Sequence, residues 1–301
     1  MPKITRQHLK LVEAAAEIRA EEADKVERAF MARQLVQVTL PHRQPAGSPR
    51  VWTRKNGNLT LTITPGWDTK KGEPLPYPAG SIPRLLLYWI TTEALRTKSR
   101  VLMVGNNLAD FMRQLGLDPS TGGGPRSDAA RLRQQIEALF RATISLDYDE
   151  GDDDKGRKSW VDMKIAAKGN FWWNFKDPDS PSLFGSEVYL TEEFFEAIIT
   201  APVPVNMRAL RALKSSPMAL DLYAWATFKT FMVNRSRKPQ RVPWQAMATQ
   251  LGADYGDLRD FRKKALAALR KVSAVYPGFS WEQTPGGIIV KPGALAIAPK
   301  T

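Results

Sequence analysis

Cysteine is absent from this chain of 301 residues, and histidine occurs only twice, at His8 and His42. The lack of cysteine excludes disulfides, thiolate metal ligands and a cysteine nucleophile. It also fits a reducing cytoplasm, where we expect this protein to act. A histidine-dependent nicking enzyme would need a close metal-binding histidine pair and a tyrosine nucleophile, and the two histidines lie far apart in sequence. We therefore expect no metal site and no catalytic residue.

Long apolar runs are also missing. A helix that spans a membrane needs about 20 apolar residues, whereas the apolar run Leu85–Ile90 is closed by Arg84 and Thr91. The N-terminus has no uninterrupted apolar stretch of the kind found in signal peptides. The run Leu85–Ile90 therefore predicts a core helix, and no membrane partner is expected.

Motifs for nucleotide or cation binding are lacking too. No GxxxxGK[ST] sequence occurs, and the glycine-rich loop at residues 120–127 has no lysine where a phosphate-binding loop needs one. The acidic run at residues 149–154 does not have the spacing of a calcium-binding loop. We interpret it as the solvated tip of a hairpin, and we expect no cofactor.

Positive charge is what the chain has in excess, with 44 Lys and Arg against 31 Asp and Glu, a net charge of +13. Val205 to Thr301 hold 16 basic and 5 acidic residues, and residues 1–204 hold the remaining 28 and 26. The C-terminal third thus carries +11 of the +13. This asymmetry favours a domain that binds a polyanion, with a merely soluble basic domain as the alternative.

The first elements can be read from apolar spacing and turn residues. Leu9, Val12 and Ala16 are apolar positions between charges, and the pattern predicts a helix over residues 5–37. The stretch "PHRQPAGSP" predicts a loop. After it, Asn56-Gly57 between alternating apolar residues predicts a β-hairpin, because this dipeptide supplies the positive φ angles of a tight turn.

A longer pattern begins at Ser81, which we expect to cap a helix. A short strand, two more helices and a pair of strands follow in the expected order. The ranges are 81–98, 100–104, 106–116, 127–143, 144–149 and 157–167. Helix, strand, helix, helix, strand, strand is the order of a winged helix, in which a helix-turn-helix is followed by a hairpin wing.

The same order returns near the C-terminus, at residues 216–233, 240–242, 243–252, 254–272, 278–283 and 288–292. Three nearly equal offsets support a duplication: Gln114–Asp118 matches Gln250–Asp254 at 136, Pro83 and Pro217 lie 134 apart, and Tyr88 and Tyr223 lie 135 apart. The predicted fold class is α+β, with tandem winged-helix domains and an N-terminal helix. An unrelated pair of α+β domains is the alternative.

The region between the copies predicts a strand at 187–190, a helix at 191–199 and a linking helix at 207–213. The break "APVPV" before the linking helix marks a domain boundary. We therefore predict three parts. They are an N-terminal helix and loop at 1–49, an N-terminal winged-helix domain with a leading hairpin at 50–204, and a basic C-terminal winged-helix domain at 205–301.

Two helices could read DNA, because the second helix of a helix-turn-helix enters the major groove. Ser127–Ala142 carries Asp128 and Glu137 and precedes the acidic run, so it suits contact with another protomer better than contact with phosphate. Asp257–Val272 has basic residues on both flanks of an expected core face, with a solvated amphipathic helix as the alternative. That core face comprises Leu258, Phe261, Ala265, Leu269 and Val272.

The candidate DNA-binding residues come from this second helix, from the run "NRSRKPQR" and from the base of the second wing. Arginine suits the guanine edge and lysine suits phosphate. The wing tip at residues 284–287 has no basic residue of its own. The candidates are Arg259, Arg262, Lys263, Lys264, Arg270 and Lys271 on the helix, Arg235, Arg237, Lys238 and Arg241 in the run, and Lys291 at the wing.

Two stretches, "PGWDTKKGEPLPYPAGSIPRLLLYWITTEA" and "LRALKSSPMALDLYAWATF", resemble the plasmid-encoded RepA family of replication initiators from Gram-negative plasmids. The resemblance covers roughly residues 50–290. It implies two winged-helix domains, binding of directly repeated origin sequences (iterons) and help in opening an AT-rich segment. It also implies recruitment of the host initiator DnaA and the helicase DnaB, and dimers joined through the N-terminal winged helix that repress their own promoter.

The function that we predict is a plasmid replication initiator without catalytic chemistry. A dimeric winged-helix transcriptional repressor with no replication role is the alternative. An enzyme acting on DNA is a third hypothesis, and it predicts metal-dependent nicking of supercoiled plasmid.

Overall fold

The structure of the protein, a computed structural model, combines helices and sheets. It describes residues 6–21, 26–121, 124–152, 155–174, 177–182, 185–251 and 255–298. The chain divides into two compact units. Unit 2 is Leu40–Ala201, and unit 1 combines Met1–Thr39 with Pro202–Thr301. In sequence, unit 2 is therefore an insertion into unit 1. The expected N-terminal part, residues 1–49, is shared between the two units.

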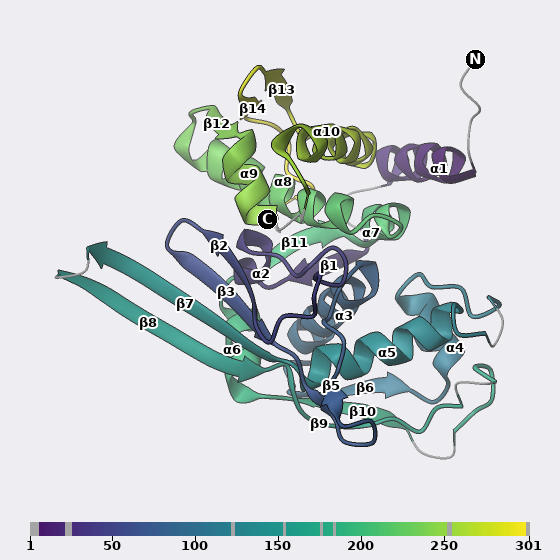
Figure 1. Ribbon diagram of the computed structural model, residues 1–301. Coiled ribbons are helices and arrows are strands. Elements are labelled where there is room, and N and C mark those ends of the chain that lie inside the picture. The colour runs from purple at the N-terminus through teal and green to yellow at the C-terminus, as the bar shows by residue number, and fades with distance from the viewer. Residues whose placement is uncertain are drawn as a thin grey trace. The chain divides into compact units, whose positions relative to one another are not determined.

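Unit 2 contains two larger antiparallel sheets and four helices (Figure 1). The four-stranded sheet has the order β2-β3-β7-β8 and the three-stranded sheet has the order β6-β10-β9. Its strands are β2 (Trp52–Asn56), β3 (Leu59–Thr64), β6 (Val101–Gly105), β7 (Thr143–Asp152), β8 (Lys155–Lys164), β9 (Ala166–Asn170) and β10 (Ser186–Leu190), with a small pair β4 (Trp67–Asp68) and β5 (Glu73–Pro74). Its helices are α3 (Ser81–Thr97), α4 (Leu108–Gln114), α5 (Asp128–Arg141) and α6 (Glu192–Thr200).

Helix α3 is the core of unit 2, as its apolar run predicted. All six side chains of Leu85–Ile90 are buried, and α3 packs against α5, α6 and β6. The cap prediction was wrong, because Ser81 is the first residue of the helix and the capping position is Gly80, at φ 86°. A left-handed φ of this kind is easily reached only by glycine, so the chain enters α3 by a sharp turn.

The buried guanidinium of Arg84 ties the entry to α3 to the start of unit 2. Arg84 is 2% exposed and donates to the carbonyl oxygens of Leu40 at 2.6 Å, Pro41 at 3.1 Å and Gly80 at 2.8 Å. A buried charge is tolerated when its donors are satisfied in this way. Arg84 therefore fixes the segment at residues 40–41 beside the first turn of α3.

The proline-rich lead to α3 is a docked segment. Tyr77 is 3% exposed, and its hydroxyl donates to the Pro49 carbonyl at 2.7 Å. The side-chain amide of Gln44 exchanges two hydrogen bonds with the backbone of Tyr77, at 2.7 and 2.9 Å. Gln135 of α5 accepts from the backbone N–H of Ala79 at 3.0 Å. The proline-rich segment thus runs along the expected loop at residues 41–49. The side chains of Gln44 and Gln135 are the hydrogen-bond partners of its backbone groups, which would otherwise be buried without partners.

The two hairpins of the four-stranded sheet differ from expectation in detail. The β2–β3 hairpin is confirmed, but Asn56 pairs with Leu59, so the turn is Gly57-Asn58 with Gly57 at φ 57°. The β7–β8 strands are longer than expected and run beyond the end of β3 as a two-stranded ribbon (Figure 1). The expected turn at 150–156 is therefore largely strand, and residues 153–154 lie outside the described residues.

Unit 1 contains two antiparallel sheets, one two-stranded with β1 beside β11 and one three-stranded with the order β12-β14-β13. Its strands are β1 (Arg28–Met31), β11 (Val203–Asn206), β12 (Gln240–Pro243), β13 (Trp281–Thr284) and β14 (Gly287–Val290). Its helices are α1 (Arg6–Ala20), α2 (Arg33–Gln37), α7 (Met207–Leu213), α8 (Pro217–Ser236), α9 (Trp244–Leu251) and α10 (Leu258–Val275). The linking helix and the second series of elements were therefore predicted correctly.

The prediction of one helix over residues 5–37 was wrong. Helix α1 ends at Ala20, and β1 pairs antiparallel with β11, with Arg28 opposite Asn206. The cause is a long-range partner, because a strand edge at β11 offers backbone hydrogen bonds that no local pattern reveals. The expected apolar stripe of α1 is also on the open side, where Leu9 is 51% and Val12 is 67% exposed, whereas Ala15 is buried.

The two sequence copies share one hydrogen bond, which is buried in the second copy and partly buried in the first. The indole N–H of Trp89 on α3 donates to the side-chain oxygen of Gln114 on α4 at 2.9 Å. The indole of Trp225 on α8 donates in the same way to Gln250 on α9 at 3.2 Å. Both pairs are 25 residues apart, so the residues that carried the sequence repeat make the same contact in each unit. The end of that repeat, at residues 252–254, lies outside the described residues.

The first helices of the two copies also end alike. Helix α3 stops at Lys98 with φ 52°, and helix α8 stops at Arg237 with φ 56°. A left-handed residue of this kind ends a helix and turns the chain sharply. In each copy the short strand, β6 or β12, follows within a few residues.

We predict that Arg84→Met lowers the free energy of unfolding by about 3 kcal/mol, because it removes three hydrogen bonds and leaves the buried carbonyl of Leu40 without the guanidinium donor. Urea denaturation of the full chain measures the change. Arg96→Met on the same helix is the matched control, since Arg96 is exposed and its ion pair with Glu93 is on the surface. The control is expected to change stability by less than about 0.5 kcal/mol. Equal effects of the two substitutions would contradict the role given to Arg84.

Candidate nucleic-acid interface

Helix α10 carries the largest group of candidate residues. It begins after Asp257, whose carboxylate accepts the backbone N–H of Asp260 at 2.7 Å. A negative cap suits the positive end of a helix. One face of α10 is buried and packs against α8 and α9. That face comprises Phe261, Ala265, Ala268, Leu269, Val272 and Val275.

The expected core face of α10 was wrong at one position. Leu258 is 41% exposed, because it is the first residue of the helix and the ring of Tyr255 packs there against Phe261 at 5.8 Å. The other four expected core residues are buried. The face opposite this core is therefore firmly oriented, and it carries the basic side chains.

The basic side chains of α10 have no carboxylate partners within the part of the chain that the structure describes. Arg259, Lys263, Lys264 and Arg270 are exposed and Lys271 is half-buried. The ion pairs found between described residues of unit 1 involve Arg208, Arg211 and Lys291 instead, as later paragraphs describe. Unpaired cations along one helix create a positive potential and can bind phosphate without first breaking an ion pair.

Arg262 differs from the other basic residues of α10. It is half-buried, and its guanidinium carbon lies 6.0 Å from the centre of the Trp244 ring, at the start of α9. Arginine stacked on an aromatic face is held in a fixed direction. Trp244 was not foreseen as a partner, although its position directly after the short strand was visible in the sequence.

The basic run brings four more cations to the surface of unit 1. Arg235 lies in the last turn of α8, Arg237 ends that helix, and Lys238 follows it; all three are exposed. Arg241 is exposed on β12, opposite Ile289 of β14. One of its terminal nitrogens would lie 3.0 Å from a Cβ atom at Gly286, in the β13–β14 turn. Arg241 therefore supplies the charge that the turn at 284–287 lacks.

Two lysines beside this run are engaged within the protein. Lys291 forms an ion pair with Glu282 at 2.6 Å, so its charge is largely compensated. Lys229, which sequence reasoning missed, donates to the side chain of Gln240 at 3.2 Å and lies 6.0 Å from the centre of the Trp225 ring. Burial lowers the pKa of Lys229. Lys229 stands between Phe228 and Thr230 on α8, and these neighbours in the sequence did not indicate the contacts.

On the corresponding surface of unit 2, three arginines of α4 and α5 are paired with carboxylates, whereas Arg141 at the end of α5 is exposed and forms no ion pair with another described residue. On α5, Arg131 lies 3.2 Å from Asp128 and Arg133 lies 3.8 Å from Glu137. On α4, Arg113 forms ion pairs with Asp110 at 2.7 Å and Asp179 at 3.2 Å. Such arginines would have to exchange a carboxylate for a phosphate, so they gain little on binding DNA.

The β7–β8 ribbon carries one ion pair at the edge of its acidic run. The strand register sets Asp149 opposite Lys158. Asp149 and Lys158 form an ion pair at 3.7 Å. The expectation that the tip beyond them repels phosphate concerns side chains outside the described residues and stays a prediction.

The described residues contain neither a membrane-spanning helix nor a cluster of metal ligands. No helix there is long and apolar enough to cross a membrane. No group of three or more His, Asp or Glu side chains there is arranged to hold a metal ion.

Comparison with known proteins gives a family and a structural likeness. A family model described as "Plasmid encoded RepA protein" matches residues 76–246. The crystal structure of domains 2 and 3 of RctB is similar at 11% identity, covering 85% of this chain and 93% of that one, with a TM-score of 0.51. A second structure of RctB domains 2–3 matches at 11% identity, with 85% and 94% covered and a TM-score of 0.41. No curated protein sequence matches.

We predict that Arg259→Ala combined with Lys263→Ala weakens binding to a duplex protected by the protein by at least about 2 kcal/mol. Fluorescence anisotropy of the full chain measures the affinity. The matched control is Arg131→Ala with Arg133→Ala on α5, where each arginine has a carboxylate partner; a change below about 0.5 kcal/mol is expected. Wild-type affinity in the α10 variant would show that α10 is not the reading helix.

Proposed function

The chain belongs to the family of plasmid-encoded RepA proteins, whose model matches more than half of its length, and we propose that it initiates plasmid replication by binding iterons in double-stranded origin DNA. The observation that carries the proposal, beyond the family, is the row of unpaired cations on α10. Family membership supports replication initiation, and the cations support the place at which DNA binds.

The architecture that we propose is a pair of winged helices. In unit 1 the order α8, β12, α9, α10, β13, β14 and the sheet β12-β14-β13 support this assignment. In unit 2 the order α3, β6, α4, α5, β7, β8 and the shared Trp-to-Gln hydrogen bond support it. There β6 pairs with β10, whereas β7 and β8 pair with β3, so unit 2 is a modified version of the same plan.

In this proposal α10 enters the major groove. Arg259, Lys263 and Arg270 on one flank reach base edges and phosphates, and Lys264 and Lys271 on the other flank reach phosphates. Arg235, Arg237 and Lys238 hold the backbone beside the groove, and Arg241 supplies a contact at the wing. Trp244 stands at the start of the helix-turn-helix, and Arg262 stacks on its ring. This contact fixes the direction in which the guanidinium of Arg262 donates.

The two units have different roles in the proposal. Unit 1 reads DNA, whereas unit 2, with its paired arginines, forms the dimerisation and regulatory part of the expected 50–204 domain. By the family resemblance, the monomer binds iterons and opens the origin, and it recruits the host initiator DnaA and the helicase DnaB. No catalytic step is required of any residue, because initiation here consists of binding and recruitment.

A footprint of the protein on the DNA that flanks the protein's own gene tests the proposed role in replication initiation. We expect several directly repeated protected sites of equal length, and a plasmid with those repeats should replicate only when the protein is supplied. One protected inverted repeat at the promoter, with no replication, would favour the alternative of a dimeric winged-helix repressor. Metal-dependent nicking of the supercoiled plasmid would favour an enzyme.

The salt dependence of binding tests the phosphate contacts. Each phosphate neutralised by a cation contributes about −0.9 to the slope of log K against log salt concentration. Arg237→Ala and Lys238→Ala are each expected to make the slope less negative by about 0.9 and to weaken binding equally on all sequences. Lys291→Ala is the control, because its partner Glu282 already compensates its charge. A slope unchanged by the first two substitutions would remove the basic run from the interface.

A further inference from the structure

The N-terminal segment, residues 6–21 and 26–39, contacts both ends of the α9–α10 pair. The sequence predicted only a helix here, over residues 5–37, and the family match begins at residue 76. Helix α1 packs directly against α7 and α10, and α2 packs against α8. The segment is therefore built into unit 1, and two polar contacts define where it acts.

The first contact lies at the end of α9, where the turn to α10 begins. The hydroxyl of Thr39 donates to the carbonyl oxygen of Leu251, the last residue of α9, at 3.1 Å. Thr39 is 2% exposed and Leu251 is fully buried. The last carbonyl groups of a helix have no partner within the helix, and a buried carbonyl needs one. Thr39 supplies that partner from a point 212 residues away in sequence.

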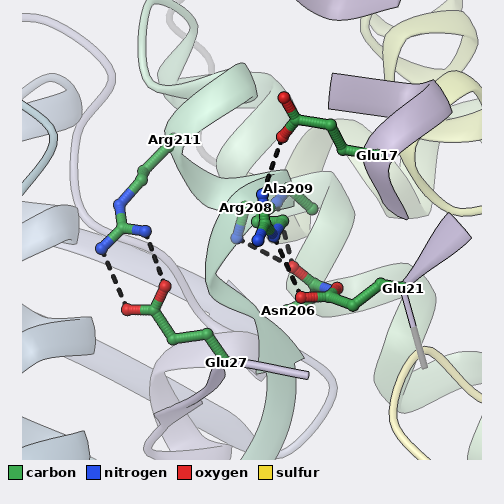
Figure 2. A network of polar contacts seen from close by, with 7 residues as sticks. All are labelled: Glu17, Glu21, Glu27, Asn206, Arg208, Ala209 and Arg211. Atoms are coloured by element: carbon green, nitrogen blue, oxygen red, sulfur yellow. Dashed lines mark hydrogen bonds and ion pairs between the residues drawn. The ribbon is translucent and has the colours of Figure 1, made fainter. Parts of the chain in front are cut away.

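The second contact is an ion-pair network on α1 and α7 (Figure 2). The side chain of Glu21 is 6% exposed and accepts from the guanidinium of Arg208 at 3.0 Å and from the amide of Asn206 at 2.8 Å. Glu17 binds the same guanidinium at 2.8 Å. Farther along, Glu27 forms a two-bond pair with Arg211, at 2.6 and 2.9 Å. These pairs hold α1 and the start of β1 on α7.

The network continues inward to the other end of α10. The backbone N–H of Asn206 donates to the hydroxyl of Tyr223 at 3.0 Å. The ring of Tyr223 meets the ring of Tyr276 edge to face at 6.0 Å. Tyr276 is the residue that ends α10, and its N–H closes the helix on Val272. Burial raises the pKa of Tyr223 above its usual range, so the phenol stays neutral.

We infer that the N-terminal segment is a positioning element for the DNA-reading helix, with Thr39 holding α9 before α10 begins and Glu21 holding the network that reaches the end of α10. This inference rests on the proposed function, since it assumes that α10 reads bases. Neither residue touches DNA in this scheme; each acts through the backbone that it fixes.

The physical consequence is a difference between two kinds of binding. Base contacts need side chains held to within about 0.5 Å, whereas phosphate contacts by long lysine and arginine side chains tolerate larger shifts. Loss of either N-terminal contact should therefore reduce specific affinity more than non-specific affinity. Partial unfolding would have a different signature, because it lowers the active fraction equally for both kinds of DNA.

The test uses full-length protein and two probes, the footprinted duplex and a scrambled duplex of equal length. Thr39→Val removes the hydroxyl and keeps the shape; about a tenfold loss of specific affinity is expected, with less than a twofold change on the scrambled duplex. Thr39→Ser keeps the hydroxyl and should restore the wild-type ratio. Thr97→Val is the control, since the Thr97 hydroxyl bonds within its own helix, to Glu93.

Glu21→Gln gives an independent measurement, with Glu13→Gln on the preceding helix α1 as its control. About a threefold loss of the specific-to-non-specific ratio is expected for Glu21→Gln and none for Glu13→Gln. Failure of the wild-type protein to distinguish the two duplexes would overturn the proposed function. A wild-type protein that distinguishes them, together with an unchanged ratio in Thr39→Val and Glu21→Gln, would overturn this inference alone. An equal loss on both duplexes would also overturn it, because that outcome indicates unfolding.

Discussion

The hydrogen bond from a buried tryptophan to a glutamine one helix later organises both repeats. An indole N–H in a core must find an acceptor, and Gln114 and Gln250 provide it at matching positions. Because the donor is on the long first helix and the acceptor is near the end of the short second helix, the bond joins those two helices in each unit. The third helix then packs on the first, as α5 does on α3 and α10 on α8. In unit 1 this sequence of constraints determines which face of α10 remains open.

Charge pairing, more than charge number, separates the two helices that could have read DNA. Arg131 and Arg133 sit one turn from carboxylates on α5, so spacing along the helix already compensates them. On α10 the acidic residues Asp257 and Asp260 are confined to the first turn, where they serve the cap. In the remaining turns, every charged residue is a cation, and exposed Ala267 lies among them. The same principle accounts for Lys291, which is basic in sequence but compensated by Glu282 across the hairpin.

Local signals predicted much of the fold, and the errors fall where a distant partner decides. Ser127, Thr191 and Asp257 are residue types that favour helix starts, and each accepts a backbone N–H at the start of its helix. Residues 28–31 had helical spacing but form a strand, since the edge of β11 is available to them. Periodicity placed the core of α10 correctly except at Leu258, and it could not indicate that Trp244 receives Arg262. The candidate cations could be named from the sequence. Whether a carboxylate lies beside each of them depends on cross-strand and cross-helix geometry.

The pairing of β1 with β11 has a consequence for the order in which the protein can fold. Met31 is made long before Val203, its strand partner. At about 5–20 residues per second, the ribosome takes roughly 10–35 s to supply the missing strand. Unit 2, whose sequence is continuous, can fold during that interval. Unit 1 must then pair β1 with β11 around an already folded insertion. Contacts of such high sequence separation slow folding. The open face of α10 is therefore completed only after the C-terminal third has left the ribosome, so an unfinished chain does not present that face.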